Sequence, residues 1–125
     1  MIEDDKNNKF GCFVGSTISY HDIYINDQQV FVFTLKNNGR IRNDNGMMKF
    51  DVLDCECGLY LLESNSKWLF VIGDDISIKK KGVSGSFINE TSFNYEGMKN
   101  VLIGKTSSNE YSYFTPKHIV VIQMN

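Results

Sequence analysis

The fold of this chain is decided by a stretch that reads Gln29-Val30-Phe31-Val32-Phe33-Thr34-Leu35-Lys36. Successive side chains of a β-strand point to opposite faces, so Phe31, Phe33 and Leu35 would lie together on one side. The residues that alternate with them would form a second, mainly apolar side. A strand with two such faces is suited to the middle of a sheet, where both faces are covered. The stretch therefore predicts a central β-strand.

Similar short runs recur along the whole chain, and each is interrupted by Gly, Asn, Asp or Ser. The sequence contains no alanine, the residue that most favours helices, and it is rich in Phe, Tyr, Ile and Val, which favour strands. The Asn-Gly pairs at 38–39 and 45–46 tolerate the positive φ angles of two-residue hairpin turns. The further runs that we expect to form strands are residues 10–14, 19–25, 47–53, 59–63, 67–73, 76–78, 92–95, 101–104 and a last one after Pro116.

Roughly eight to ten short strands with regular turns predict an all-β, mainly antiparallel fold. We expect a two-sheet β-sandwich with at most short helical pieces, and a barrel is the alternative. Residues 1–8 are polar and acidic, and we expect them to be a disordered N-terminus. No repeat or change in composition divides the rest, so residues 9–125 should form a single domain.

The charge and the cysteines indicate the partners and the compartment. The net charge of −2 lacks the basic excess that sequence-independent binding to nucleic acid normally needs, so nucleic acid is not the favoured partner. The N-terminus has no apolar core of a secretion signal, and no apolar run reaches eighteen residues. Three cysteines, an odd number, fit a reducing compartment. We expect an intracellular protein of the cytoplasm or nucleus without a transmembrane segment.

Cys55 and Cys57 are candidates for thiol chemistry, because residues two apart on a strand face the same side. Cys12, His21 or His118 would have to complete four zinc ligands, and the spacing is not that of a zinc ribbon. We therefore expect no metal and no other cofactor. The pair stays a candidate redox site, because two neighbouring thiols can oxidise each other.

Asp74 and Asp75 follow an apolar run and Gly73, where two carboxylates could bind calcium or act as an acid–base pair. We favour a solvated turn, because like charges avoid burial. His21 and His118 are far apart in the sequence, and no serine or cysteine stands in a G-x-S-x-G setting. We expect no catalytic residue and a protein that is not an enzyme.

Lys79, Lys80 and Lys81 form the only basic run of the sequence and begin a glycine-containing loop that we expect to be mobile. They are a candidate partner-binding site for an acidic protein, lipid headgroups or nucleic acid. Trp68 begins the apolar run Trp68–Ile72, and we expect it in the core. The sequence shows no interleaved aromatic pattern of the kind found in RNA-binding sheets.

Five short segments carry a further pattern in their order and spacing. They are Phe10-Gly11, Phe31-Val32-Phe33-Thr34-Leu35, Phe70-Val71-Ile72-Gly73-Asp74-Asp75-Ile76-Ser77-Ile78, Thr91-Ser92-Phe93-Asn94-Tyr95 and Phe114-Thr115-Pro116-Lys117-His118-Ile119-Val120-Val121. Together they resemble the TLDc domain, over about residues 9–123. The resemblance is to a TLDc domain shortened at its N-terminus.

The resemblance implies a sandwich of two antiparallel sheets that acts as a non-catalytic protein-interaction module in the oxidative-stress response. Family members bind the vacuolar proton-pumping ATPase (V-ATPase) and promote its disassembly, so the resemblance implies this partner. A shortened N-terminus would leave an edge or an apolar groove open, which predicts a homodimer or a protein partner that covers it. Two alternatives stay open: a nucleic-acid-binding stress regulator that uses Lys79, Lys80 and Lys81, and a redox-active thiol protein that uses Cys55 and Cys57.

Overall fold

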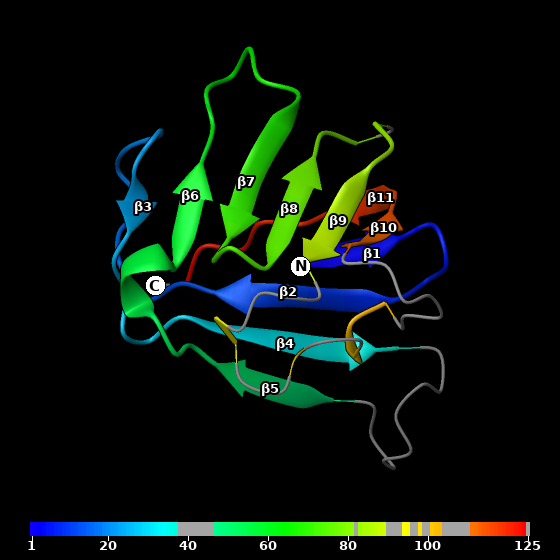
Figure 1. Ribbon diagram of the computed structural model, residues 1–125, viewed down its shortest axis with the longest axis horizontal. Coiled ribbons are helices and arrows are strands. Elements are labelled where there is room, and N and C mark those ends of the chain that lie inside the picture. Colours follow the sequence, from blue (N-terminus) through cyan, green and yellow to red (C-terminus); the bar gives the residue numbers. More distant parts are fainter. Residues whose placement is uncertain are drawn as a thin grey trace.

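The computed structural model describes residues 1–37, 47–81, 83–89, 94–95, 98, 101–103 and 111–124. In these residues eleven strands form two antiparallel sheets, which confirms the expected all-β sandwich (Figure 1). The strands are β1 Ile2–Asp4, β2 Lys9–Phe13, β3 Tyr24–Ile25, β4 Phe31–Lys36, β5 Met48–Asp51, β6 Leu59–Leu61, β7 Trp68–Ile72, β8 Ile76–Lys79, β9 Ser86–Asn89, β10 Tyr111–Phe114 and β11 Pro116–Ile119. A single turn of 3-10 helix, η1, spans Cys55–Cys57. The described residues include no helix long and apolar enough to cross a bilayer.

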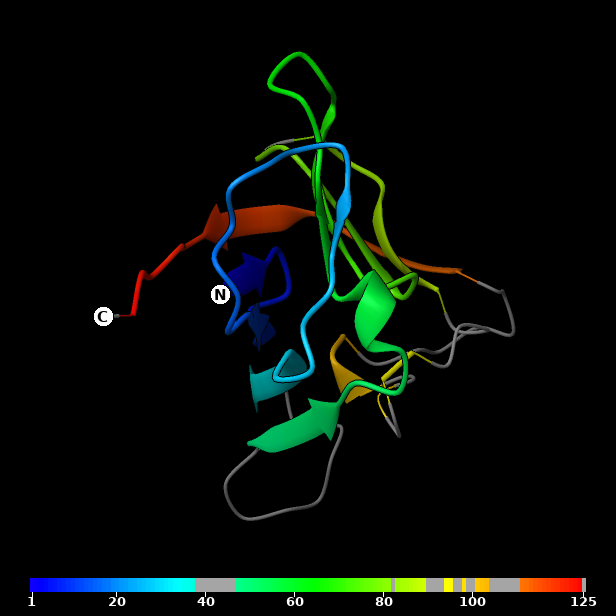
Figure 2. The same cartoon turned by 90° about the vertical axis from the view of Figure 1, so that its left-hand side faces the viewer.

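The two sheets cross steeply. One has the strand order β11-β1-β2-β4-β5 and the other the order β10-β9-β8-β7-β6-β3. In Figure 1, β2, β4 and β5 run across the view, whereas β6 to β9 run up and down. Figure 2 shows residues 14–23 arching from the first sheet to the second, and residues 120–124 leading away from the body of the molecule. The strand alternation therefore gives each sheet one side toward a shared core and one side outward.

The central position predicted for residues 29–36 is confirmed, because β4 lies between β2 and β5. Its Val32 and Thr34 are fully buried, whereas Phe31 and Phe33 are only half-buried. The core between the sheets is apolar, and burying each aliphatic side chain contributes about 1.5–3 kcal/mol. Its buried members are Ile2, Phe10, Val32, Phe50, Leu59, Ile72, Ile76, Ile78, Ile88, Tyr95, Met98, Leu102, Ile103 and Phe114. One face of β4 thus builds the core, and the other is left on the outside.

The N-terminus differs from the sequence prediction. Residues 1–8 were expected to be disordered, but β1 lies between β2 and β11, and Ile2 is buried in the core. Asp4 is also buried, because its carboxylate closes the turn to β2. It accepts hydrogen bonds from the backbone N–H groups of Lys6 (2.9 Å) and Asn8 (2.8 Å). A polar sequence can therefore be ordered when a buried carboxylate is fully hydrogen-bonded.

The C-terminal part forms two strands where the sequence predicts one. β11 begins at Pro116 itself, although the sequence predicts a start after this residue, and proline is tolerated at a strand entry. β10 precedes it in the other sheet, so the chain changes sheets at Thr115. This corner joins the two layers of the sandwich covalently.

Some predicted elements are shorter or differ in kind. Only Tyr24–Ile25 of the predicted strand at 19–25 pairs, and residues 101–103 form no strand. Tyr95 makes only an isolated bridge with Val52. Both Asn-Gly pairs and residues 91–93 lie outside the described residues. Strand β9 was not predicted at all.

Candidate functional site

The outer side of the six-stranded sheet carries a row of aromatic side chains, which we call the aromatic face: Trp68 of β7, Phe87 of β9, and Tyr111 and Tyr113 of β10. The Phe87 ring meets the Trp68 and Tyr111 rings edge to face, with centroids 5.7 Å and 5.0 Å apart. Its centroid lies 6.1 Å from that of Tyr113, its direct cross-strand partner. Aromatic pairs at such separations attract each other beyond the area that they bury. The four rings therefore form one connected surface.

Trp68 corrects a sequence prediction, because it lies on this surface and not in the core. The pairing of β7 with β8 shifts register between Trp68 and Phe70, which sets Trp68 opposite Lys79. The indole is half-buried, and the Lys79 ammonium lies 4.7 Å from its centroid. This is within the range of a cation–π interaction. The apolar run that follows Trp68 misled the prediction, because a register shift changes which face a side chain occupies.

Four lysines gather where β7 begins and β8 ends, and we call Lys67, Lys79, Lys80 and Lys81 the lysine end. The backbone N–H of Lys80 donates to the Lys67 carbonyl (3.1 Å), which holds the two strands together there. The Lys80 ammonium donates to the Ser64 carbonyl (2.5 Å). Within the described part of the chain, none of the four makes an ion pair with a carboxylate. The candidate site at Lys79, Lys80 and Lys81 is thus partly a strand, since Lys79 is the last residue of β8.

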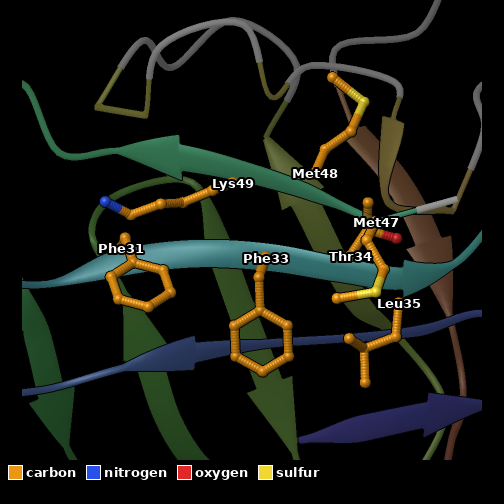
Figure 3. Close-up of a pocket in the computed structure, with 7 residues that line it drawn as sticks. All are labelled: Phe31, Phe33, Thr34, Leu35, Met47, Met48 and Lys49. Atoms are coloured by element: carbon orange, nitrogen blue, oxygen red, sulfur yellow. The ribbon is translucent and has the colours of Figure 1, made fainter. Parts of the chain in front are cut away.

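A shallow apolar groove of about 380 Å³ lies on the outer side of the five-stranded sheet (Figure 3). It is lined by Phe31, Phe33, Thr34, Leu35, Met47, Met48 and Lys49. Figure 3 shows Phe31, Phe33 and Leu35 pointing the same way from β4. We call this site the apolar groove.

The neighbours of the apolar groove fix its shape. A side chain at Gly11 would come within 2.8 Å of the Phe33 ring, so the absence of a Cβ there lets Phe33 lie flat on the sheet. Phe13 stacks on Phe31 with centroids 5.2 Å apart. Met47 at the rim is 62% exposed. The groove is therefore an apolar surface with a rigid aromatic floor and an exposed edge.

The two candidate redox cysteines lie in η1, in a turn and not on a strand. Asp54 caps this turn by accepting a hydrogen bond from the backbone N–H of Glu56 (3.0 Å). Burial, and then the charges of Asp54 and Asp74, raise the pKa of the Cys57 thiol. Cys55, Cys57 and Cys12 are all free thiols. Because the thiolate is the reactive form, these surroundings do not activate Cys57.

Asp74 and Asp75 have separate roles. Asp74 is exposed and accepts a hydrogen bond from the Tyr24 hydroxyl (2.9 Å). Asp75 is 1% exposed, which corrects the expectation of a solvated turn at this residue. Its carboxylate accepts hydrogen bonds from the backbone N–H groups of Asn94 (3.4 Å) and Tyr95 (3.0 Å). Burial nevertheless raises the pKa of Asp75 to about 6, because the two N–H donors offset only part of the desolvation.

Gly73, Asp75, Asn94 and Tyr95 form a buried group that we call the Asp75 cluster. Gly73 has φ +56°, and a Cβ there would come within 2.5 Å of the Asn94 amide nitrogen. The Asn94 side-chain oxygen accepts a hydrogen bond from the backbone N–H of Asp54 (3.0 Å), and the Tyr95 hydroxyl donates to the Gly58 carbonyl (3.2 Å). The Asn94 side-chain nitrogen has no partner among the described residues. The cluster fastens the segment at 94–95 to the turn between β7 and β8.

The described residues do not assemble the zinc ligands considered from the sequence. In this part of the chain, the group whose ligand atoms all lie within 4.8 Å of one another is His21, Asp22 and Glu63, all exposed. His21 Nδ1 already lies 2.8 Å from an Asp22 carboxylate oxygen. His118 lies elsewhere, 3.4 Å from Glu3. The cysteines and the two histidines therefore do not form a common site.

The sequence did not reveal the aromatic face, because its members come from three separate strands. Only Tyr111 and Tyr113 show the i, i+2 spacing of a shared strand face. Phe87 joins them through the register of β9 with β10, and Trp68 joins through the register shift in β7. The i, i+2 tyrosines were the one available signal. No family model, curated protein or solved structure matches this chain.

Proposed function

We propose that this chain is a non-catalytic protein-interaction module of the TLDc kind that acts in the oxidative-stress response, with the V-ATPase as its partner. The observation that carries the proposal is the apolar groove. Contiguous apolar surface on the outside of a sheet marks interaction sites in many proteins. Phe31 and Phe33 present rigid rings, and rigid aromatic anchors in a desolvated centre dominate the energy of protein interfaces.

The choice of the V-ATPase as partner is supported by the five segments that resemble the TLDc domain. Two of them meet in the Asp75 cluster, where Gly73 and Asp75 come from one segment and Asn94 and Tyr95 from another. A third supplies Phe31, Phe33 and Leu35 to the apolar groove. The residues that carry the resemblance thus contribute both to the interior and to the proposed interaction surface.

The test is binding of the immobilised chain to the purified soluble sector of a vacuolar proton pump, with and without prior peroxide treatment. The wild-type chain should retain the pump sector. Met47→Asp should reduce the affinity at least about tenfold, because a carboxylate at the groove rim would be desolvated by the partner. Tyr113→Asp is the matched control, because Tyr113 is also 62% exposed but lies on the other sheet.

Three results would contradict the proposal. The first is a wild-type chain that retains no pump subunit. The second is an equal loss of affinity in both variants, since the groove would then have no special role. The third is a stable dimer in light scattering that Met47→Asp dissociates, because a second copy of the chain would then cover the groove.

A further inference from the structure

We propose that the aromatic face, together with the lysine end, binds single-stranded nucleic acid. The proposal concerns the opposite sheet from the apolar groove and does not depend on the function proposed above. It rests on the arrangement of four rings, on the lysines beside them and on the chemistry that both could recognise.

The rings supply a stacking surface of suitable size. Neighbouring strands of a sheet lie about 4.8 Å apart, so the row from β7 to β10 spans about 14 Å, enough for roughly two or three unstacked bases. Tyr113, 62% exposed, offers the largest free ring area of the four. Phe87 at the centre is held by contacts with three other rings. Base–aromatic stacking is tolerant of sequence, because every base has a π-face.

The lysines supply the charge for the phosphate backbone. The Lys79 ammonium lies over the Trp68 ring, 4.7 Å from its centroid, so a cation belongs directly to this surface. Lys67 and Lys81 are exposed. Among the described residues, no carboxylate is paired with an ammonium group of the lysine end, so these groups remain available to phosphates. The local charge therefore differs in sign from the net charge of −2.

The combination favours a single strand over a duplex and over an acidic peptide. In a duplex the bases are stacked on each other, so rings on a sheet cannot reach their faces. An acidic peptide would use the lysines but would leave the row of rings without a matching group. Only a flexible polyanion whose units carry flat rings uses both features of the surface.

Trp68 provides the measurement, because it is the only tryptophan of the chain and belongs to the proposed site. Twelve-residue oligo(dT) and oligo(U) should quench its fluorescence at low salt and raise the anisotropy of a labelled strand. Comparison of oligo(dT) with oligo(U) distinguishes a preference for DNA from a preference for RNA. The logarithm of the affinity should fall with the logarithm of salt concentration with a slope of about −2 to −3, as expected for three or four phosphate contacts to a single strand.

Matched variants separate the rings from the charges. Tyr113→Ala should weaken binding about tenfold with little change in the salt slope, because it removes one stacking ring. Lys67→Gln with Lys81→Gln should reduce the magnitude of the salt slope by about 1.4. Met47→Ala on the opposite sheet is the control and should leave binding unchanged. Circular dichroism of each variant checks that the fold is kept.

The proposal is overturned if neither oligonucleotide binds at low salt, or if Tyr113→Ala binds as tightly as the wild type. It is also overturned if polyglutamate or a duplex of equal length binds as tightly as the single strands, because the lysines would then act alone. Selective binding of the single strands that is lost with Tyr113 would establish the site.

Discussion

The Asp75 cluster and the aromatic face are both built from segments far apart in the sequence, but they differ in what their side chains do. In the cluster, Asp75 and Asn94 are buried, and most of their polar atoms are hydrogen-bonded to backbone groups. In the aromatic face, the rings contact one another, and the outermost ring, Tyr113, is 62% exposed. The Asp75 cluster therefore stabilises the fold, whereas the aromatic face has surface available for a ligand. Substitutions in the first should change stability, and substitutions in the second should change binding.

The largest effect on stability is expected for Gly73→Ala in the Asp75 cluster. The new Cβ would meet the Asn94 amide nitrogen at 2.5 Å and the Tyr95 ring at 2.9 Å, and φ +56° is unfavourable for alanine. We expect the free energy of unfolding to fall by about 3 kcal/mol, measured by urea denaturation. Gly15→Ala is the control and should cost less than about 1 kcal/mol, because its nearest contact would be the terminal amide oxygen of the flexible Gln29 side chain, at 2.5 Å, with the Gln29 Cβ at 3.2 Å. Equal costs at both glycines would show that the cluster is not rigid.

The pH dependence of the free energy of unfolding gives a second test of the Asp75 cluster. The pKa of Asp75 is raised by burial from 3.8 to about 6 in the folded protein. A raised pKa in the folded state favours folding at low pH, and this contribution is lost as the pH rises from about 4 to about 6. Asp75→Asn cannot ionise, so the stability of the wild type relative to this variant should fall across that interval. Urea midpoints of the two proteins at several pH values measure it, and parallel curves would mean that Asp75 does not titrate there.

Substitutions in the aromatic face should change the free energy of unfolding less, and the effect of removing one ring should depend on the presence of its neighbour. Phe87→Ala, Tyr111→Ala and the double variant form a cycle that isolates the contact between the two rings. We expect a coupling free energy of about 0.5–1.5 kcal/mol in the free energy of unfolding. A coupling near zero would mean that the edge-to-face geometry at 5.0 Å adds nothing beyond the area that each ring buries.

The smallest effects are expected at the thiols of η1. Burial and the neighbouring carboxylates raise the pKa of Cys57, so it is protonated at neutral pH and should react slowly. Thiol titration before and after mild peroxide should give the same count. The Cys55→Ser, Cys57→Ser double variant should keep the free energy of unfolding within about 0.5 kcal/mol. A loss of two thiols after peroxide in the wild type would instead support the redox alternative.

The sequence predicted the fold class well because strand formation depends on local alternation. The faces of β4 follow directly from the pattern of Phe31 to Leu35. The order of the N-terminus could not be predicted, since Asp4 is buried only because the turn to β2 brings two backbone donors to its carboxylate. Strand β9 was missed because Phe87 has few apolar neighbours in sequence and gains its contacts from β7 and β10.

The candidate site was harder to predict than the fold, for a related reason. Lys79, Lys80 and Lys81 were visible as a charge run, but no sequence pattern indicated that Lys79 would lie over Trp68. The two aspartates after Gly73 look alike in the sequence, yet one is exposed and the other buried. Register and tertiary contacts decide such differences, and neither can be obtained from residue spacing alone.

The pairing of β1 with β11 has a consequence for how this protein acquires its structure. Ile2 lies opposite Ile119, so a strand near the start of the sequence completes its sheet only when a strand more than a hundred residues later is present. Contacts between such distant residues carry a large loop-closure entropy and slow the formation of a fold. During synthesis β1 would have one neighbour and an open edge until β11 had left the ribosome. The nascent chain therefore exposes a pairing edge, and chaperones that shield strand edges should matter most in this interval.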